Sequence, residues 1–171
     1  MISNITTRIA LGLSAALLTA SMAQATLRVV FDEGAPKDRF LIENRSDCTL
    51  RGSTVMLDLS TSQGALIFDV TERGAGVEVY QPFELVEGKD RLTTVPTVID
   101  GQSKLQLSVD SLAPGEKVVF TIDVDDTIGQ REITVSGAEI AGATVSFSQA
   151  GQTSAATFTS RASADLAIGS C

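Results

Sequence analysis

The densest group of acidic side chains in the chain is formed by Asp123, Asp125 and Asp126. It lies at the end of an alternating segment whose apolar face is formed by residues 118, 120, 122 and 124. Asp123 and Asp125 should therefore share the other face, with Cβ atoms about 7 Å apart. Two carboxylates at that distance can clamp a cation whose oxygen ligands lie at about 2.3–2.6 Å, and Asp126 would add a third oxygen. The pattern therefore predicts a calcium site. The alternative is a solvated acidic face that protects a sheet edge from aggregation.

The chain contains no histidine and only two cysteines. A Ser-His-Asp or Cys-His nucleophile is therefore impossible, and the commonest transition-metal ligand is missing. Two cysteines are too few for the usual structural zinc sites. We expect a protein without enzymatic activity.

The two cysteines, Cys48 and Cys171, predict a disulfide. Thiols of exported proteins normally pair in an oxidising compartment. Cys48 lies in an early loop and Cys171 is the last residue, so a bridge would tie the C-terminal tail to the domain. The competing interpretation is that Cys171 pairs with another molecule.

The first 25 residues resemble an export signal peptide. Arg8 precedes an apolar stretch, residues 9–18, and Ala23 and Ala25 form a small-x-small cleavage site. Cleavage would leave residues 26–171 as a single domain of 146 residues. Because no second long apolar run follows, we expect no membrane insertion after cleavage and a periplasmic or extracellular location.

The composition disfavours several classes of partner. Removing residues 1–25, which hold one basic residue, leaves 12 basic and 21 acidic residues, a net charge of −9. Such a charge disfavours binding to nucleic acid or to anionic membranes. The single tyrosine and the absence of tryptophan disfavour a lectin with aromatic platforms for sugars.

The spacing of apolar residues predicts an all-β fold. Residues 105–109 alternate, Pro114-Gly115 marks a reversal, and residues 118–124 alternate again. We expect these two strands to form the central pair of an antiparallel β-sandwich, immunoglobulin-like or jelly-roll, with about ten short strands. Residues 50–60 and 65–71 should form a hairpin. Further strands are expected at 27–31, 38–44, 77–80, 83–86 (at an edge), 92–95, 132–135, 143–147, 155–161 and 164–168.

Two segments resemble a group of small exported bacterial proteins. They are Asp123-Val124-Asp125-Asp126 after the Leu112–Glu116 turn, and Ile140-Ala141-Gly142-Ala143-Thr144-Val145. The chain is similar, over residues 40–147, to proteins described as aggregation factor core proteins. The resemblance implies cell adhesion through calcium-dependent β-domains of the Calx-β kind.

These observations favour an exported, non-enzymatic β-sandwich that acts by surface contact in adhesion, a matrix or the cell envelope. Its partner would be an unknown protein or cell-surface component. The alternative is a periplasmic ligand-binding or accessory protein. A large apolar pocket between the sheets would favour the alternative, and a long unpaired edge strand or an exposed apolar patch would favour surface contact.

Overall fold

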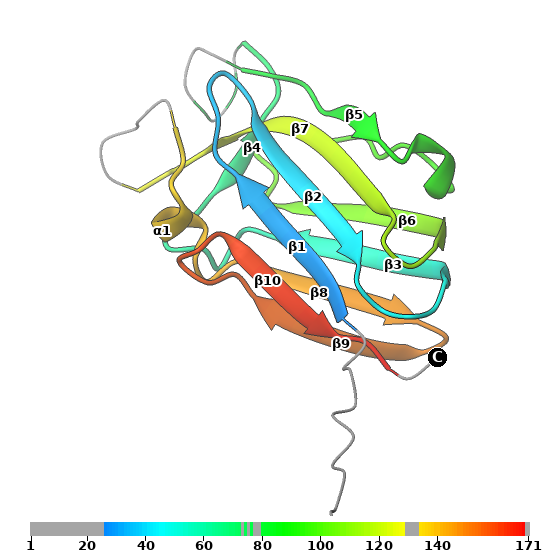
Figure 1. Cartoon of the computed structure of the whole chain (residues 1–171). Helices are drawn as coiled ribbons and strands as arrows, with labels where there is room; N and C mark the ends of the chain where they lie inside the picture. Colours follow the sequence, from blue (N-terminus) through cyan, green and yellow to red (C-terminus); the bar gives the residue numbers. More distant parts are fainter. Residues whose placement is uncertain (1–25, 73, 75, 77–79, 129–133, 170–171) are drawn as a thin grey trace, which may run out of the picture.

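A computed structural model describes residues 26–72, 74, 76, 80–128 and 134–169, and it forms two antiparallel sheets that face each other (Figure 1). The described part contains ten strands, which confirms the predicted all-β antiparallel sandwich. The strands are β1 (Thr26–Asp32), β2 (Asp38–Asn44), β3 (Leu50–Asp58), β4 (Ile67–Asp69), β5 (Glu84–Glu87), β6 (Lys104–Leu112), β7 (Lys117–Asp125), β8 (Thr144–Gln149), β9 (Gln152–Thr157) and β10 (Ser163–Ala167). The helical turns are η1 (Lys89–Arg91) and α1 (Gly137–Ile140).

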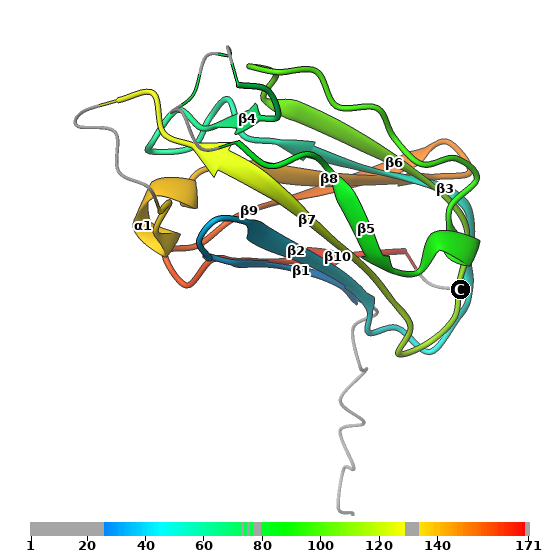
Figure 2. The same cartoon turned by 90° about the horizontal axis from the view of Figure 1, so that it is seen from above.

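The two layers are best separated in the view from above (Figure 2). The first sheet has the order β10-β1-β2-β7-β4, and β5 also pairs with β7. The far side of β7 is therefore shared: β5 begins opposite Thr121, and β4 lies opposite residues 123–125. The second sheet has the order β6-β3-β8-β9.

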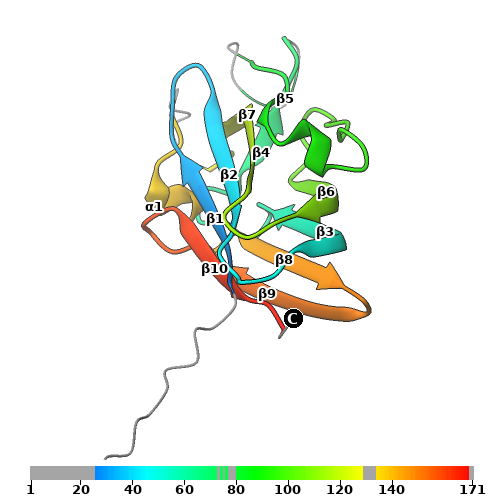
Figure 3. The same ribbon diagram turned by 45° about the vertical axis from the view of Figure 1, so that its right-hand side comes forward.

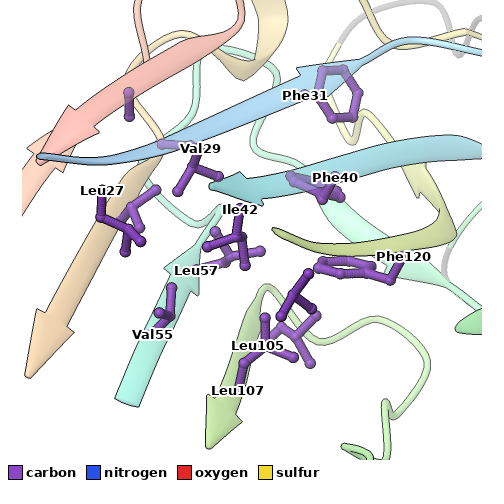
Figure 4. Close-up of a cluster of buried hydrophobic side chains, with 14 of the residues drawn as sticks. Leu27, Val29, Phe31, Phe40, Ile42, Val55, Leu57, Leu105, Leu107 and Phe120 are labelled. Carbon is purple, nitrogen blue, oxygen red and sulfur yellow. The ribbon is translucent and has the colours of Figure 1, made fainter. Parts of the chain in front are cut away.

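The core lies between the sheets. It contains the inward-facing residues at alternate strand positions (Figure 4) together with loop residues such as Leu59, Leu66 and Phe158. Four phenylalanines organise its centre. The Phe40 ring stacks on Phe120 at a centroid distance of 5.1 Å and also contacts Phe31 and Phe68. Phe40, Phe68 and Phe120 are fully buried, so this cluster supplies a large share of the apolar area removed from water.

The connection between β6 and β7 differs from the prediction. The two strands do not pair with each other. Leu107 of β6 lies opposite Val55 of β3 in the second sheet, and Phe120 of β7 lies opposite Phe40 of β2 in the first. The Pro-Gly turn therefore carries the chain from one sheet to the other. Both apolar faces still reach the core, since each strand presents its face from a different side of the sandwich.

The predicted hairpin of residues 50–60 and 65–71 is also wrong. Strand β3 is central in the second sheet, whereas β4 pairs with β7 in the first. Ser62 makes the turn: its Oγ donates to the Leu59 carbonyl oxygen at 2.6 Å and accepts the Leu66 N–H at 2.8 Å. The chain does turn at the predicted place, but a turn in the sequence does not determine which strands pair.

Other predicted strands are shortened or lie elsewhere. Residues 92–95 form no strand and keep one bridge, Leu92 to Val109. Parts of two further segments, residues 77–79 and 132–133, lie outside the described residues. The edge position predicted for residues 83–86 is confirmed, since β5 pairs with β7 alone. In the described part, no helix is long and apolar enough to cross a membrane.

Candidate functional site: a buried aspartate cluster

Strand β7 presents Asp123 and Asp125 on the face opposite to its core residues, as the alternation predicts. The two side chains are not solvated. Asp123 is 6% exposed and Asp125 is 2% exposed. The interpretation of this face as a solvated acidic surface is therefore wrong, and the carboxyl groups need another physical explanation.

Strand β4 adds a third aspartate that the sequence did not single out. Asp69 lies directly opposite Asp123 in the antiparallel register, and its side chain is 0% exposed. Among the described residues, neither Asp69 carboxylate oxygen has a hydrogen-bond partner, and neither does Asp123 Oδ2. Buried polar atoms are nearly always satisfied, so these three oxygens are exceptional.

Gly76 shows how close Asp69 and Asp125 are. A Cβ added to Gly76 would lie 2.1 Å from Asp125 Oδ2 and 2.4 Å from Asp69 Oδ2. The two oxygens are therefore at most 4.5 Å apart, the sum of these distances. Any residue larger than glycine would collide with the carboxylates here.

A fourth aspartate, Asp38, begins β2 and is 1% exposed. Its Oδ1 accepts the Gly34 N–H and its Oδ2 accepts the Val124 N–H, each at 3.1 Å. The side chain thus extends the β2–β7 ladder beyond the last paired backbone group. The pKa of Asp38 is raised to about 8, first by burial and then by the Asp123 and Asp125 carboxyls, although the two N–H donors lower it.

Asp100 approaches the cluster from the loop before β6 and is half-buried. Its Oδ1 accepts the N–H groups of Val70 and Thr71 at 2.9 and 3.2 Å, which fixes the chain as it leaves β4. Ionised carboxylates can only accept hydrogen bonds, so Asp100 and Asp69 repel each other unless they share a proton. The pKa of Asp69 is accordingly raised to about 7, mainly by burial, then by Asp100 and Asp125.

Among the described residues, Asp38, Asp69 and Asp123 take part in no ion pair. The pKa of Asp123 is also raised to about 7, by burial and by the charges of Asp125 and Asp69. The ion pairs of the described residues lie elsewhere, as in Arg28–Asp165 at 3.0 Å, and none involves Asp38, Asp69 or Asp123. Burial of an ionised carboxylate is costly, so the raised pKa values of Asp38, Asp69 and Asp123 favour the protonated form of these groups.

The predicted set of Asp123, Asp125 and Asp126 is not brought together as a three-carboxylate clamp. Across residues 26–128 and 134–169, apart from the gaps within them, no three Asp, Glu or Cys side chains are arranged to hold a metal ion. Asp126 follows the end of β7, where its Cβ lies 3.4 Å from the position of a Cβ on Gly64. Strand alternation directs it away from the face of Asp125. The pairing of β4 with β7, which brings in Asp69, has no local sequence signal.

Of the two cysteines, only Cys48 belongs to the described part, in the loop between β2 and β3. No free cysteine occurs there. Asn44 and Ser46 organise this loop, since Asn44 Nδ2 donates to the carbonyl oxygens of Cys48 and Leu112 at 2.7 and 2.8 Å. Cys171 lies outside the described residues, so its pairing with Cys48 stays a prediction.

Comparison with known proteins gives no relative from which a function could be transferred. No family model, no curated protein and no solved structure matches the chain.

Proposed function

We propose that the protein is an exported, non-enzymatic β-sandwich that acts by surface contact, and that strand β9 pairs with β9 of a second copy. The observation that carries the proposal is the edge of β9 that faces away from β8, with which no described strand pairs. This strand pairs with β8 and is the outermost strand of its sheet (Figure 3). Edge strands present unpaired N–H and C=O groups that can template another strand.

The hairpin geometry identifies which groups face outward. Ala150 and Gly151 form a two-residue turn with φ values of 50° and 80°. Gln149 and Gln152, which flank the turn, are then a hydrogen-bonded pair, and alternate pairs along the ladder repeat this. The peptide groups of Thr153, Ala155 and Thr157 therefore point away from β8, and all three residues are exposed.

Strand β9 lacks the usual protection of an edge. Residues 152–157 contain no charged residue and no proline. The opposite edge of the same sheet is better covered: β6 carries Lys104, and the Thr93 N–H donates to the Ser108 carbonyl oxygen at 2.9 Å. The contrast favours β9 as the contact strand.

A second copy suits this edge. Antiparallel pairing about a two-fold axis at Ala155 places Thr153 opposite Thr157, a favourable cross-strand pair. Because β9 carries no charged side chain, two copies of the strand do not repel each other at the contact, although the whole chain is negatively charged. A groove of about 670 Å³, lined in part by Thr157 of β9, Asp165 of β10 and Arg28 of β1, lies between the edges of the two sheets.

The test uses the mature chain, residues 26–171, in 1 mM calcium. Sedimentation equilibrium should show a reversible dimer, and beads coated with the protein should clump. Ala155→Pro removes an outward N–H without removing a bond to β8, so it should weaken self-association at least tenfold. Thr94→Lys, on an exposed loop, is the control and should associate like the wild type.

A wild-type protein that stays monomeric at several hundred micromolar and leaves beads dispersed would overturn the proposal. So would equal clumping by the Ala155→Pro variant with an unchanged melting temperature.

A further inference from the structure

We propose that the groove between the edges of the two sheets binds a small carboxylic acid that carries several hydroxyl groups, such as a sugar acid. Arg161, which lines the groove with Arg28 and Asp165, supplies the positive charge for the carboxylate. The groove has a volume of about 670 Å³, within the range of sites for small molecules. All lining residues belong to one chain, so binding here does not require the second copy that pairs through β9.

One wall of the groove is the outer face of the first sheet. Arg28 lies opposite Asp165 in the β1–β10 register, and Ser163 lies two residues before Asp165, so the three side chains share this face. Arg28 Nη1 donates to Asp165 Oδ1 and Oδ2 at 3.2 and 3.0 Å. This ion pair holds the guanidinium in place. Among the described residues, Arg28 Nε and Nη2 have no hydrogen-bond acceptor, so they can donate to a ligand.

The tight turn between β9 and β10 positions Arg161. The Thr159 N–H donates to the Ser163 carbonyl oxygen at 3.0 Å, and the Ala162 N–H donates to the Thr159 carbonyl oxygen at 2.9 Å. The Arg161 N–H itself donates to Thr159 Oγ1 at 3.3 Å. The Phe31 N–H donates to the Ala162 carbonyl oxygen at 2.9 Å, which ties the turn to β1. Because the backbone of Arg161 is fixed before a ligand binds, less conformational entropy is lost on binding.

The charges of the groove favour a carboxylate. Arg28 and Asp165 compensate each other, whereas the Arg161 guanidinium takes part in no ion pair of the described residues. A guanidinium presents paired N–H donors that match the two oxygens of a carboxylate. One carboxylate therefore balances Arg161. A phosphate dianion would leave an excess negative charge beside Asp165, in a chain that is already acidic.

The rest of the lining suits a ligand with hydroxyl groups. Thr157 and Ser163 carry hydroxyls that can donate and accept, and no hydrogen bond within the described part of the chain uses them. The Asp165 oxygens keep lone pairs beyond those used by Arg28. Of the described residues that line the groove, none is aromatic, so an apolar acid would gain little contact there. A carboxylic acid with several hydroxyls uses both the charge and the polar lining.

Glucuronate is the probe for the test. Mature protein labelled with nitrogen-15 is titrated at pH 7 and constant ionic strength, and the backbone amide signals are followed by NMR. The signals of Thr157, Arg161 and Ser163 should shift and saturate. Glucose, which lacks the carboxylate, and acetate, which lacks the hydroxyls, should each bind at least tenfold more weakly, as should phosphate. Absence of shifts at about 20 mM glucuronate would overturn the proposal, and so would equal binding of acetate and glucuronate.

Two matched variants assign the charge. Arg161→Gln should weaken glucuronate binding at least tenfold and leave the melting temperature unchanged, because the side chain is exposed. Arg51→Gln makes the same change at an exposed position of β3 outside the groove, and it should bind like the wild type. Equal weakening in both variants would mean attraction by overall charge and would refute the site, as would unchanged binding in Arg161→Gln. A protein that binds glucuronate but remains monomeric would refute only the proposed contact at β9.

Discussion

Replacing Asp38 by asparagine tests whether a buried carboxyl group is protonated in the folded protein. Asp38 accepts hydrogen bonds from the N–H groups of Gly34 and Val124. Its pKa is about 8 in the folded protein, against an ordinary value of 3.8 for an aspartate side chain. A carboxyl with a raised folded-state pKa binds more protons in the folded than in the unfolded state between these values. Its contribution to stability is therefore fully present below pH 3.8 and is lost as the pH rises toward 8.

The size of the effect follows from linkage. Each pH unit changes the stability by about 1.4 kcal/mol for one such group, so wild-type protein should lose at most about 4 kcal/mol through Asp38 between pH 5 and 8. Asp38→Asn loses nothing through this position. It begins with a deficit of about 1–3 kcal/mol, because the amide NH₂ cannot accept one of the two N–H groups. The two stability curves should therefore converge or cross as the pH rises.

Urea denaturation in EDTA at pH 5, 6, 7 and 8, at constant ionic strength, measures the difference. The control is Asp165→Asn, whose side chain is 48% exposed and pairs with Arg28 on the surface. Its difference from the wild type should stay constant over this range. If the Asp38→Asn difference is equally constant, Asp38 is ionised in the folded state and the reasoning from burial is refuted.

Three further outcomes are expected. Phe40→Ala should reduce the free energy of unfolding by about 3–5 kcal/mol in urea denaturation, since it empties the centre of the aromatic cluster; a loss under 1 kcal/mol would contradict the central role of that ring. On non-reducing denaturing electrophoresis the exported protein should run as a monomer, thiol titration should find no free thiol, and Cys48→Ser should lower its stability by up to about 4–5 kcal/mol; two titratable thiols or a covalent dimer would rule out the Cys48–Cys171 bridge. Intact mass of exported protein should correspond to a chain beginning at Thr26, and a mass that retains Met1 would rule out cleavage there.

Strand positions were largely predictable because alternation is a local property. The predicted bounds of β2 match the structure, and those of β3 and β7 differ by at most two residues at either end. Each of these strands has one face in the core, so apolar and polar residues alternate along it with a period of two. The strand predicted at residues 92–95 does not form, because a short segment can bury one apolar side without forming the backbone hydrogen bonds of a sheet.

Strand partners were not predictable from the same signals. A turn such as Pro114-Gly115 specifies a reversal, but two strands that reverse can pair in one sheet or face each other across the core. The choice depends on contacts with strands distant in sequence, here β2 and β3. The same limit hid Asp69, whose neighbour Asp123 is more than fifty residues away. The sequence likewise carried no sign that the acidic face of β7 would be buried.

The pairing of β1 with β10 has a consequence for how the domain folds. Thr26 lies opposite Ala167, so the strand that starts the domain has one of its two neighbours at the far end of the chain. Closing a loop between residues so far apart in sequence costs conformational entropy before the pairing contributes stability. Folds with many such contacts therefore form in about milliseconds to seconds. The first sheet cannot be completed while the last strand is still being synthesised or transported. The topology itself therefore delays completion of the fold, and if the chain is exported unfolded, as we propose, this delay leaves time for transport.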